Sequence, residues 1–198
     1  MNKAAFLDRD GVINRKALTE EEYVTCWEEM RILPGVAQAI ALLNRAGFLV
    51  IVVSNQRSVA KGLITEAELN SIHQRMCDEL AGAGATIHGV YYCPHELEPA
   101  CDCRKPQPGM LLRAARVHDI DLSVSWMIGD SDKDVEAGKS AGCRTVRVLR
   151  SYETENGRGD RVARSLLEAT HKIFKCEELP IDQNAADLSV NLAYDGIS

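Results

Sequence analysis

Two aspartates separated by one residue stand near the start of the chain and offer nucleophilic and acid–base chemistry. Asp8 and Asp10 flank Arg9, and in extended backbone the side chains of residues two apart point to the same side. One carboxylate can then attack an electrophilic centre, while the other protonates the leaving oxygen and later activates water. Gly11 follows and lets the backbone turn sharply. The pattern alone is weak evidence, because Asp-x-Asp-Gly also occurs in turns and calcium loops.

Residues later in the chain supply what two carboxylates would need to act on a phosphate ester. Because carboxylates repel a phosphate, a cation such as Mg²⁺, which takes oxygen ligands, must lie between them. Asp130 is the obvious third acidic ligand, and Asp134, one helical turn further, could ligate the metal or orient its surroundings. Ser54 and nearby backbone amides could hold the phosphoryl oxygens, and Lys105 could neutralise the charge of an intermediate.

A short loop carries three cysteines and a histidine at a spacing typical of metal sites. The four candidate ligands are Cys93, His95, Cys101 and Cys103. A Cys₃His set can hold Zn²⁺ tetrahedrally with no open position, which is typical of a structural site. The alternative is four unlinked side chains on a surface loop. The odd total of seven cysteines favours metal over disulfides, and bound zinc would direct Arg104 and Lys105 toward the phosphate.

The elements that must position these residues form an α/β pattern with a parallel sheet. Apolar, β-branched runs alternate with helical patterns, which is typical of βαβ units. The expected strands are residues 4–7, 48–53, 87–92, 124–128 and 145–149. The expected helices begin near residues 34, 65, 108, 132 and 160. A single polar residue after a strand is more often a helix cap, a turn residue or a surface charge than a site residue. Here several such residues follow successive strands, and the carboxyl ends of parallel strands lie at one edge of the sheet, so we expect these residues to lie close together.

The order of these residues resembles the four motifs of the haloacid dehalogenase superfamily of phosphohydrolases. The matching segments are Phe6-Leu7-Asp8-Arg9-Asp10-Gly11-Val12-Ile13-Asn14, then Ser54, Lys105 and Gly129-Asp130-Ser131-Asp132-Lys133-Asp134, within residues 4–150. The resemblance implies a Rossmann-like three-layer fold with a small flap, about residues 11–33, in place of a large cap. It further implies attack by Asp8, acid–base catalysis by Asp10, and Mg²⁺ held by both and by Asp130. In this superfamily the second aspartate usually ligates through its backbone carbonyl.

Three further segments are similar to the D-glycero-D-manno-heptose 1,7-bisphosphate 7-phosphatase branch, whose close relative is the histidinol-phosphatase branch. These segments are Tyr91-Tyr92-Cys93-Pro94-His95, Cys101-Asp102-Cys103-Arg104-Lys105-Pro106 and Pro108-Gly109-Met110-Leu111. The resemblance implies structural zinc in the loop of about residues 93–103, and removal of the 7-phosphate of the heptose bisphosphate through an aspartyl-phosphate. Alternatives are the phosphate of histidinol phosphate or of another small sugar phosphate. These activities belong to carbohydrate or small-metabolite chemistry.

The segment after the second strand departs from the pattern of this branch. Its substrate-binding positions would be Ser54, Asn55, Gln56 and Arg57, with Arg104 and Lys105 from the cysteine-rich loop. The branch often shows Thr-Asn-Gln-Ser-Gly, so Arg57 stands where a serine is usual and places a cation near the phosphate. Arg57 could bind a second phosphate or a carboxylate of the substrate, or it could point to solvent. Ser131 replaces a lysine that is frequent in the fourth motif.

Composition limits the remaining classes of function. The chain has 198 residues and a formal net charge of −6, which argues against non-specific nucleic-acid binding. We expect one domain over residues 1–175 with a tail of 176–198, a monomer, and a cytoplasmic protein without a membrane span or targeting segment. A different hypothesis is a non-catalytic zinc-bound interaction module. Retention of clustered, mutually repelling carboxylates such as Asp8 and Asp130 argues against it.

Overall fold

The computed structural model describes residues 1–16, 23–98, 100–149 and 159–180. Six strands of this part of the chain form one parallel sheet in the order β3-β2-β1-β4-β5-β6. Their bounds are β1 Lys3–Leu7, β2 Phe48–Asn55, β3 Gly89–Cys93, β4 Trp126–Gly129, β5 Arg144–Val148 and β6 Arg161–Ala163. The four inner strands are almost continuously buried, as expected for a parallel sheet covered on both faces.

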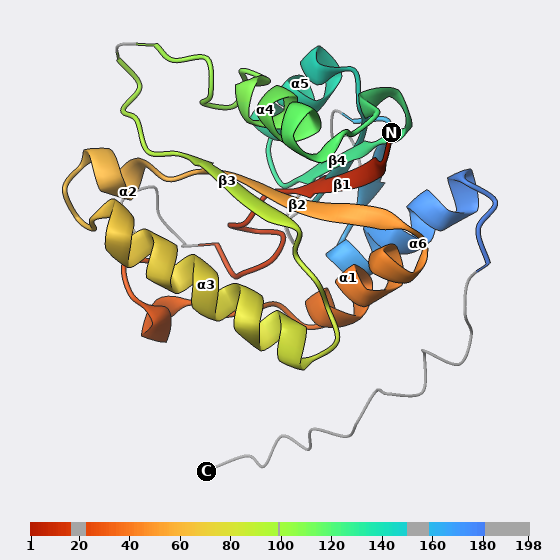
Figure 1. The fold of residues 1–198 in the computed structure, drawn as a ribbon, viewed down its shortest axis with the longest axis horizontal. Helices are drawn as coiled ribbons and strands as arrows, with labels where there is room; N and C mark the ends of the chain where they lie inside the picture. The colour runs from red at the N-terminus through yellow and green to blue at the C-terminus, as the bar shows by residue number, and fades with distance from the viewer. Residues whose placement is uncertain (17–22, 99, 150–158, 181–198) are drawn as a thin grey trace.

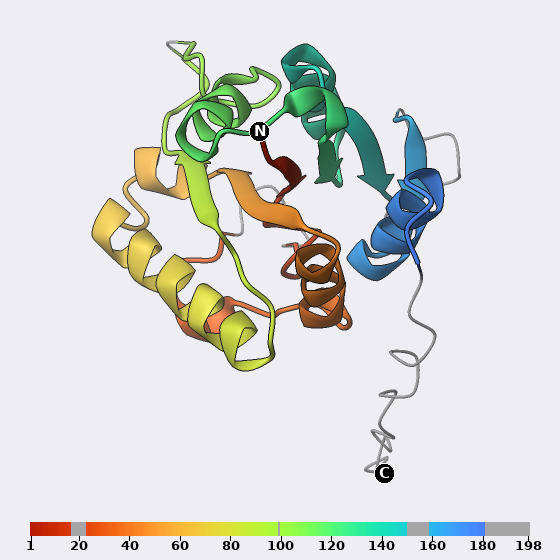
Figure 2. The same ribbon diagram turned by 45° about the vertical axis from the view of Figure 1, so that its right-hand side comes forward.

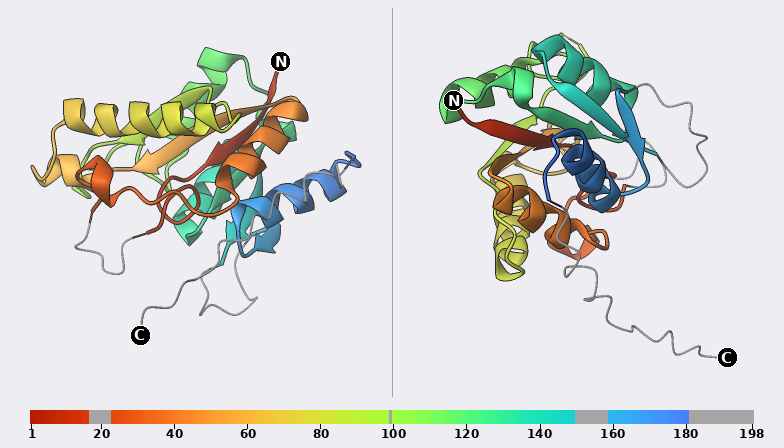
Figure 3. Two further views of the ribbon diagram at one scale, coloured as in Figure 1. Left: turned by 90° about the horizontal axis from the view of Figure 1, so that it is seen from below. Right: turned by 90° about the vertical axis from the view of Figure 1, so that its right-hand side faces the viewer.

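Helices cover the two faces of the sheet and give three layers (Figure 1). Their bounds are α1 Val36–Arg45, α2 Arg57–Ala60, α3 Glu66–Gly82, α4 Gly109–His118, α5 Asp132–Ala141 and α6 Leu166–Cys176, with short 3₁₀ turns at Trp27–Glu29 and Leu122–Val124. Helices α4 and α5 lie side by side on one face (Figures 1 and 2). Helices α1, α3 and α6 lie on the other face (Figure 3). None of the described helices has the length and apolar character needed to cross a membrane.

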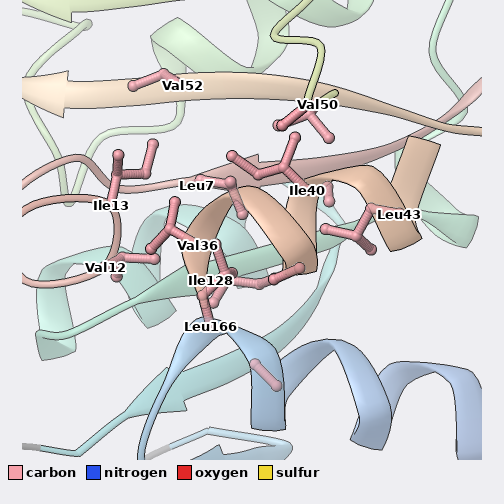
Figure 4. Close-up of a cluster of buried hydrophobic side chains, with 14 of the residues drawn as sticks. Leu7, Val12, Ile13, Val36, Ile40, Leu43, Val50, Val52, Ile128 and Leu166 are labelled. Carbon is pink, nitrogen blue, oxygen red and sulfur yellow. The ribbon is translucent and has the colours of Figure 1, made fainter. Parts of the chain in front are cut away.

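The larger hydrophobic core lies between the sheet and the layer of α1, α3 and α6. Ile40 and Leu43 of α1 point toward Val50 of β2, and Leu166 of α6 closes the cluster (Figure 4). All of these side chains are buried. A smaller core under α4 and α5 contains Phe6 and Met127. The strands are therefore held from both sides, which fixes the residues at their ends.

The strand order of the sheet reverses between β1 and β4, and this switch point is where a ligand site is expected. From β1 the chain builds outward through β2 and β3, and it then crosses back to place β4 on the other side of β1. Ligands of open parallel sheets bind at such a switch point, beyond the carboxyl ends of the strands. Asp8 follows β1 and Asp130 follows β4, so the two aspartates flank the switch point.

The sequence pattern was wrong about the segment that begins near residue 160. It predicted a helix from there, whereas the structure forms the sixth strand at Arg161–Ala163 and begins α6 at Leu166. Arg161 is exposed, Val162 is partly buried and Ala163 is buried. Ser165 caps the helix by accepting a hydrogen bond from the Glu168 amide. A strand of three residues is too short to give a recognisable period.

Helix α2 and the residues after α6 also bear on the elements expected from the sequence. The helix α2, which follows β2 after one residue, was not predicted. It has four residues, about one turn, and is too short to show a helical period in the sequence. The expected tail begins at residue 176, but Glu177 still accepts hydrogen bonds from Trp126 and Arg144. Residues 181–198 of that tail and residues 17–22 of the expected flap lie outside the described residues.

Candidate active site

Asp8 is fixed at the carboxyl end of β1, in the middle of the sheet. Its backbone amide donates to the carbonyl of Ile128 at 2.9 Å, so the residue remains in register with β4. The side chain is 10% exposed. Its Oδ1 accepts from the Arg9 amide at 2.8 Å and from Lys105 Nζ at 2.9 Å. Burial raises the pKa of Asp8 and Lys105 opposes that rise, so the anionic form depends on nearby positive charge.

Lys105 joins two carboxylates that the sequence separates widely. Its ammonium group lies 2.9 Å from Asp8 Oδ1, 2.6 Å from Asp134 Oδ1 and 2.8 Å from the carbonyl of Val53. Burial alone would lower the pKa of Lys105, but the charges of Asp134 and Asp8 outweigh it and raise the pKa. The ammonium group is therefore permanently charged at the base of the site.

Three carboxylates, one from the first motif and two from the fourth, form a candidate set of oxygen ligands. One oxygen each from Asp8, Asp130 and Asp134 lies within 4.8 Å of the others, and hard cations such as Mg²⁺ prefer such ligands. Gly11 has a φ of 98°, and a Cβ there would come within 2.6 Å of Asp130 Oδ2, so the turn must be a glycine to leave space for this carboxylate. The residues present fit a divalent cation.

Asp130 and Asp134 have different partners within this set. Both carboxylate oxygens of Asp130 accept hydrogen bonds from Lys16 Nζ, Oδ2 at 2.8 Å and Oδ1 at 3.0 Å. Asp134 instead accepts from the Ser131 amide and hydroxyl on Oδ2 while its Oδ1 pairs with Lys105. Both oxygens of Asp134 are thus engaged by protein groups, which suits a residue that orients Lys105 and the metal surroundings.

The Asp10 carboxylate turns away from this cluster and is held by three side chains. Arg9 donates to both of its oxygens at 2.9 and 3.0 Å. Asn14 Nδ2 and Gln56 Nε2 each donate at 2.9 Å. Burial alone would raise the pKa of Asp10, but the Arg9 charge and these hydrogen bonds outweigh it and lower the pKa. Asp10 also lines the site cavity.

The residues after β2 occupy the same cavity in different ways. Ser54 and Gln56 are buried and hydrogen bonded to each other at 2.8 Å. Asn55 ties the end of β2 to the backbone of Lys105 through two hydrogen bonds of 3.0 Å. Arg57 forms an ion pair with Glu96 of the cysteine-rich loop. The cavity has a volume of about 420 Å³ and is also lined by Lys16, Tyr23, Leu97 and Arg104.

The cysteine-rich loop brings its four candidate ligands together. The Cys93 and Cys103 sulfurs lie 3.5 and 3.4 Å from Cys101 Sγ, and His95 Nδ1 lies 3.2 Å from Cys103 Sγ. These sulfurs are too far apart for disulfides, which need about 2.05 Å. The loop continues directly into Arg104, whose Nη1 donates to the carbonyl of His95 at 3.1 Å.

The structure places the nominated residues in two groups. One cavity is lined by Asp8, Asp10, Ser54, Asn55, Gln56, Arg57, Arg104, Lys105 and Asp134, and Asp130 lies beside Asp8 and Asp134. The four candidate zinc ligands form a separate cluster in the cysteine-rich loop. Asn55 is the one whose side chain is committed to the backbone of another loop. Arg9 and Asn14, which hold Asp10, belong to the first motif but were given no role there. Three residues outside the motifs were also missed: Lys16 beside Asp130, Glu96 beside Arg57, and His73 beside Arg9. Lys16 and Glu96 are ordinary surface-type charges in sequence, and His73 lies in an unremarkable helical pattern. No local signal identified them.

Known proteins share both the sequence and the fold of this chain. Residues 102–169 match the model of the HAD-hydrolase-like family. The D-glycero-β-D-manno-heptose-1,7-bisphosphate 7-phosphatase of Rhodopseudomonas palustris is 46% identical over 70% of this chain and 79% of its own. The enzyme of the same name from Bordetella bronchiseptica is 39% identical over 89% of this chain and 93% of its own.

A solved structure agrees with these relatives. The D,D-heptose 1,7-bisphosphate phosphatase of B. bronchiseptica, in complex with magnesium and phosphate, superposes with a TM-score of 0.79 at 35% identity and covers 87% of this chain and 98% of its own. A haloacid dehalogenase-like phosphatase from Mesorhizobium loti gives a TM-score of 0.77 at 31% identity, with 92% and 89% covered. The chain therefore belongs to the D-glycero-β-D-manno-heptose-1,7-bisphosphate 7-phosphatase family of haloacid dehalogenase-like phosphohydrolases.

Proposed function

We propose that this protein removes the 7-phosphate of D-glycero-β-D-manno-heptose 1,7-bisphosphate through an aspartyl-phosphate on Asp8. The observation that carries the proposal is the arrangement of Asp8, Lys105 and Asp130 at the switch point of the sheet, in a chain whose relatives bear this enzyme's name. A buried carboxylate beside a fixed ammonium group is the arrangement that nucleophilic attack on a phosphate anion requires.

In the first step an oxygen of Asp8 attacks phosphorus and the bond from phosphorus to the sugar oxygen breaks. Asp10 gives its proton to that leaving oxygen, which departs as an alcohol. Because its neighbours lower the pKa of Asp10, the proton must be acquired as the substrate dianion approaches. Lys105 stays beside Asp8 and offsets the charge that collects on the phosphoryl group.

In the second step Asp10 takes a proton from water as that water attacks phosphorus. The bond from phosphorus to Asp8 breaks and inorganic phosphate leaves. Asp8 is then a carboxylate again, and Asp10 returns to its starting state by releasing to solvent the proton it took from water, which balances the proton it acquired before the first step. The low pKa of Asp10 favours this step, since it is the carboxylate that accepts the proton. Asn14 and Gln56 hold the carboxylate in the same place for both steps.

Mg²⁺ fits the oxygen ligands at the base of the site. Asp8, Asp130 and the backbone carbonyl of Asp10 would hold it, with Asp134 behind them. When bound, it supplies positive charge to the phosphoryl oxygens. Asp130 is 3% exposed, and a carboxylate buried to this degree needs positive charge beside it. Lys16 supplies one such charge, and the bound cation would supply another.

Zn²⁺ is the proposed occupant of the cysteine-rich loop. A tetrahedral ion with bonds of about 2.3 Å to sulfur places those sulfurs about 3.8 Å apart. The distances of 3.4 and 3.5 Å between the loop's sulfurs are close to this value. With four protein ligands the ion has no open position, so its role is to hold Arg104 and Lys105 at the cavity.

Arg57 is proposed to bind the second phosphate of the substrate. It lines the same cavity as Asp8 and is paired with Glu96, a single carboxylate that a phosphate dianion can displace. Arginine suits this task because its planar group binds phosphate with two parallel hydrogen bonds. The guanidinium would therefore distinguish a bisphosphate from a monophosphate.

Phosphate release from a panel of substrates tests the proposal. The panel contains both anomers of the heptose 1,7-bisphosphate, heptose 7-phosphate and histidinol phosphate, with enzyme that was treated with EDTA and then supplied with Mg²⁺. We expect the highest kcat/KM for the β-bisphosphate. Comparable rates for histidinol phosphate, or no release from any heptose, would overturn the substrate assignment.

An Arg57→Gln variant tests the second phosphate site. We expect KM for the bisphosphate to rise by about tenfold, the usual contribution of a charged hydrogen bond, with little change for heptose 7-phosphate. The matched control is Arg116→Gln, which removes an exposed arginine of α4 that does not line the cavity. Equal losses on both substrates would show that Arg57 does not bind the second phosphate.

A further inference from the structure

A histidine on α3 is connected to the candidate acid–base residue through a buried arginine. His73 is 4% exposed and Arg9 is 1% exposed. His73 Nε2 lies 3.1 Å from Arg9 Nη1. On its other side the guanidinium donates to Asp10 through Nη2 at 2.9 and 3.0 Å and through Nε at 3.2 Å. A continuous chain of hydrogen bonds thus runs from α3 to the cavity.

The chemistry of arginine fixes which atoms donate in this chain. A guanidinium group is always charged and can only donate, so the lone pair of His73 Nε2 must be the acceptor. The imidazole is then neutral, with its proton on Nδ1. Burial and the charge of Arg9 lower the pKa of His73, and Asp10 opposes them, in agreement with a neutral ring. Nδ1 is buried and has no hydrogen-bond partner among the described residues.

Both ends of the guanidinium are occupied, and this determines its orientation. The Nε and Nη2 side faces Asp10, while Nη1 faces His73. Without an acceptor at Nη1, a charged N–H would remain unpaired in the interior, which is strongly unfavourable. The guanidinium would then rotate toward another acceptor, and its hydrogen bonds to Asp10 would change. The ring of His73 is itself held against Tyr92, with ring centroids 5.6 Å apart.

We propose that His73 is a positioning residue for catalysis, which orients Arg9 so that Arg9 holds the Asp10 carboxylate against the leaving oxygen. This inference rests on the proposed function of Asp10. Packing of α3 alone would need only an apolar side chain at position 73, as at the neighbouring buried Ile72. The acceptor atom is the feature that packing does not require.

Three variants separate positioning from packing. His73→Leu removes the acceptor, and His73→Gln retains one, since its amide oxygen can reach the place of Nε2. Leu80→Ala is the matched control, because it removes buried volume from the same helix and does not line the cavity. Thermal unfolding and phosphate release are measured for all three and for the wild-type protein.

We expect kcat of His73→Leu to fall by about tenfold to a hundredfold, as small misplacements of a catalytic group do, with KM nearly unchanged. His73→Gln should recover most of that loss. Leu80→Ala should lose thermal stability but keep kcat. The loss in His73→Leu should be smaller for an aryl phosphate whose leaving group needs no proton. Equal kcat for His73→Leu and His73→Gln, in folded proteins, would overturn the proposal.

A measurement without turnover keeps the test independent of the proposed function. Nitrogen-15 NMR of the wild-type imidazole should show protonated Nδ1 and unprotonated Nε2 from pH 5 to 8. A ring that gains a second proton within this range cannot be the acceptor for Arg9, and the proposal would fail on that ground alone. If instead the wild-type protein releases no phosphate from any substrate, the proposed function fails, whatever the NMR result.

Discussion

Lys105 and Asp134 form an ion pair at 2.6 Å although both side chains are almost fully buried, at 2% and 1% exposure. Such a pair contributes little net stability compared with apolar residues, but removal of one partner leaves an uncompensated charge inside the protein. Here the same ammonium group also pairs with Asp8, so one cation compensates two buried carboxylates.

Replacement of Lys105 should therefore strongly destabilise the fold. We expect Lys105→Met to lower the free energy of unfolding by about 3–5 kcal/mol at neutral pH, measured by urea denaturation. The control is Lys139→Met, which breaks an exposed pair with Asp160 at 4.0 Å and should cost less than about 1 kcal/mol. A Lys105→Met protein as stable as the control would contradict this account of the interior charges.

The two aspartates of the first motif should respond differently to the leaving group. Asp8→Asn should reduce turnover to background on every phosphate ester, because an amide is a poor nucleophile. Asp10→Asn should lower kcat by about 10²–10⁴ on sugar phosphates and much less on 4-nitrophenyl phosphate, whose leaving group departs without a proton. The same loss of kcat on both kinds of ester would exclude Asp10 as the acid.

Lys16 should compete with divalent cations for Asp130. Its Nζ contacts both carboxylate oxygens at 2.8 and 3.0 Å, so a metal ion must displace or share this contact. We expect Lys16→Met to bind Mg²⁺ about fivefold more tightly, in proportion to the modest strength of a partly exposed ion pair. Isothermal titration calorimetry measures this affinity without substrate, with Lys61→Met as the control. Weaker binding by Lys16→Met would show that Lys16 supports the metal site.

The cysteine-rich loop should lose its metal when one ligand is changed. We expect Cys101→Ser to have well below one equivalent of zinc by elemental analysis, with a lower melting temperature and only a secondary fall in activity. Cys26→Ser is the control, since Cys26 lies apart from the cluster of candidate ligands. Unchanged zinc content in Cys101→Ser would refute the assigned ligand set.

His73 should make the stability of the protein sensitive to mild acid. Burial and the charge of Arg9 lower the pKa of His73 to about 3 in the folded protein, whereas the unfolded chain takes up the proton near pH 6.5. Stability should therefore fall as the pH drops below 6.5, by up to about 1.4 kcal/mol per pH unit. His73→Gln should show a flatter decline in the free energy of unfolding between pH 6.5 and 5. Identical slopes for the two proteins would mean that the ring is protonated in the folded state.

The sequence by itself determined the βαβ pattern, the two aspartates after the first strand and the four candidate ligands of the cysteine-rich loop. These are local features, in which residue type and spacing carry the information over a few positions. The placement of Asp130 after a strand belongs to the same class. The short strand at Arg161–Ala163 was not predicted, because three residues are too few to show the two-residue period of a strand.

Only the tertiary structure decided which of these residues touch. Asp8 and Lys105 are 97 residues apart. They meet because α4 packs against β2 and β3 and because Asn55 at the end of β2 holds the backbone of Lys105. His73 reaches Arg9 across 64 residues because α3 covers the face of the sheet beneath β2 and β3. Such contacts depend on how whole elements pack, and the residue types within α3 do not predict them. The sequence therefore contained the groups that do the chemistry, while packing alone determined which groups hold them in place.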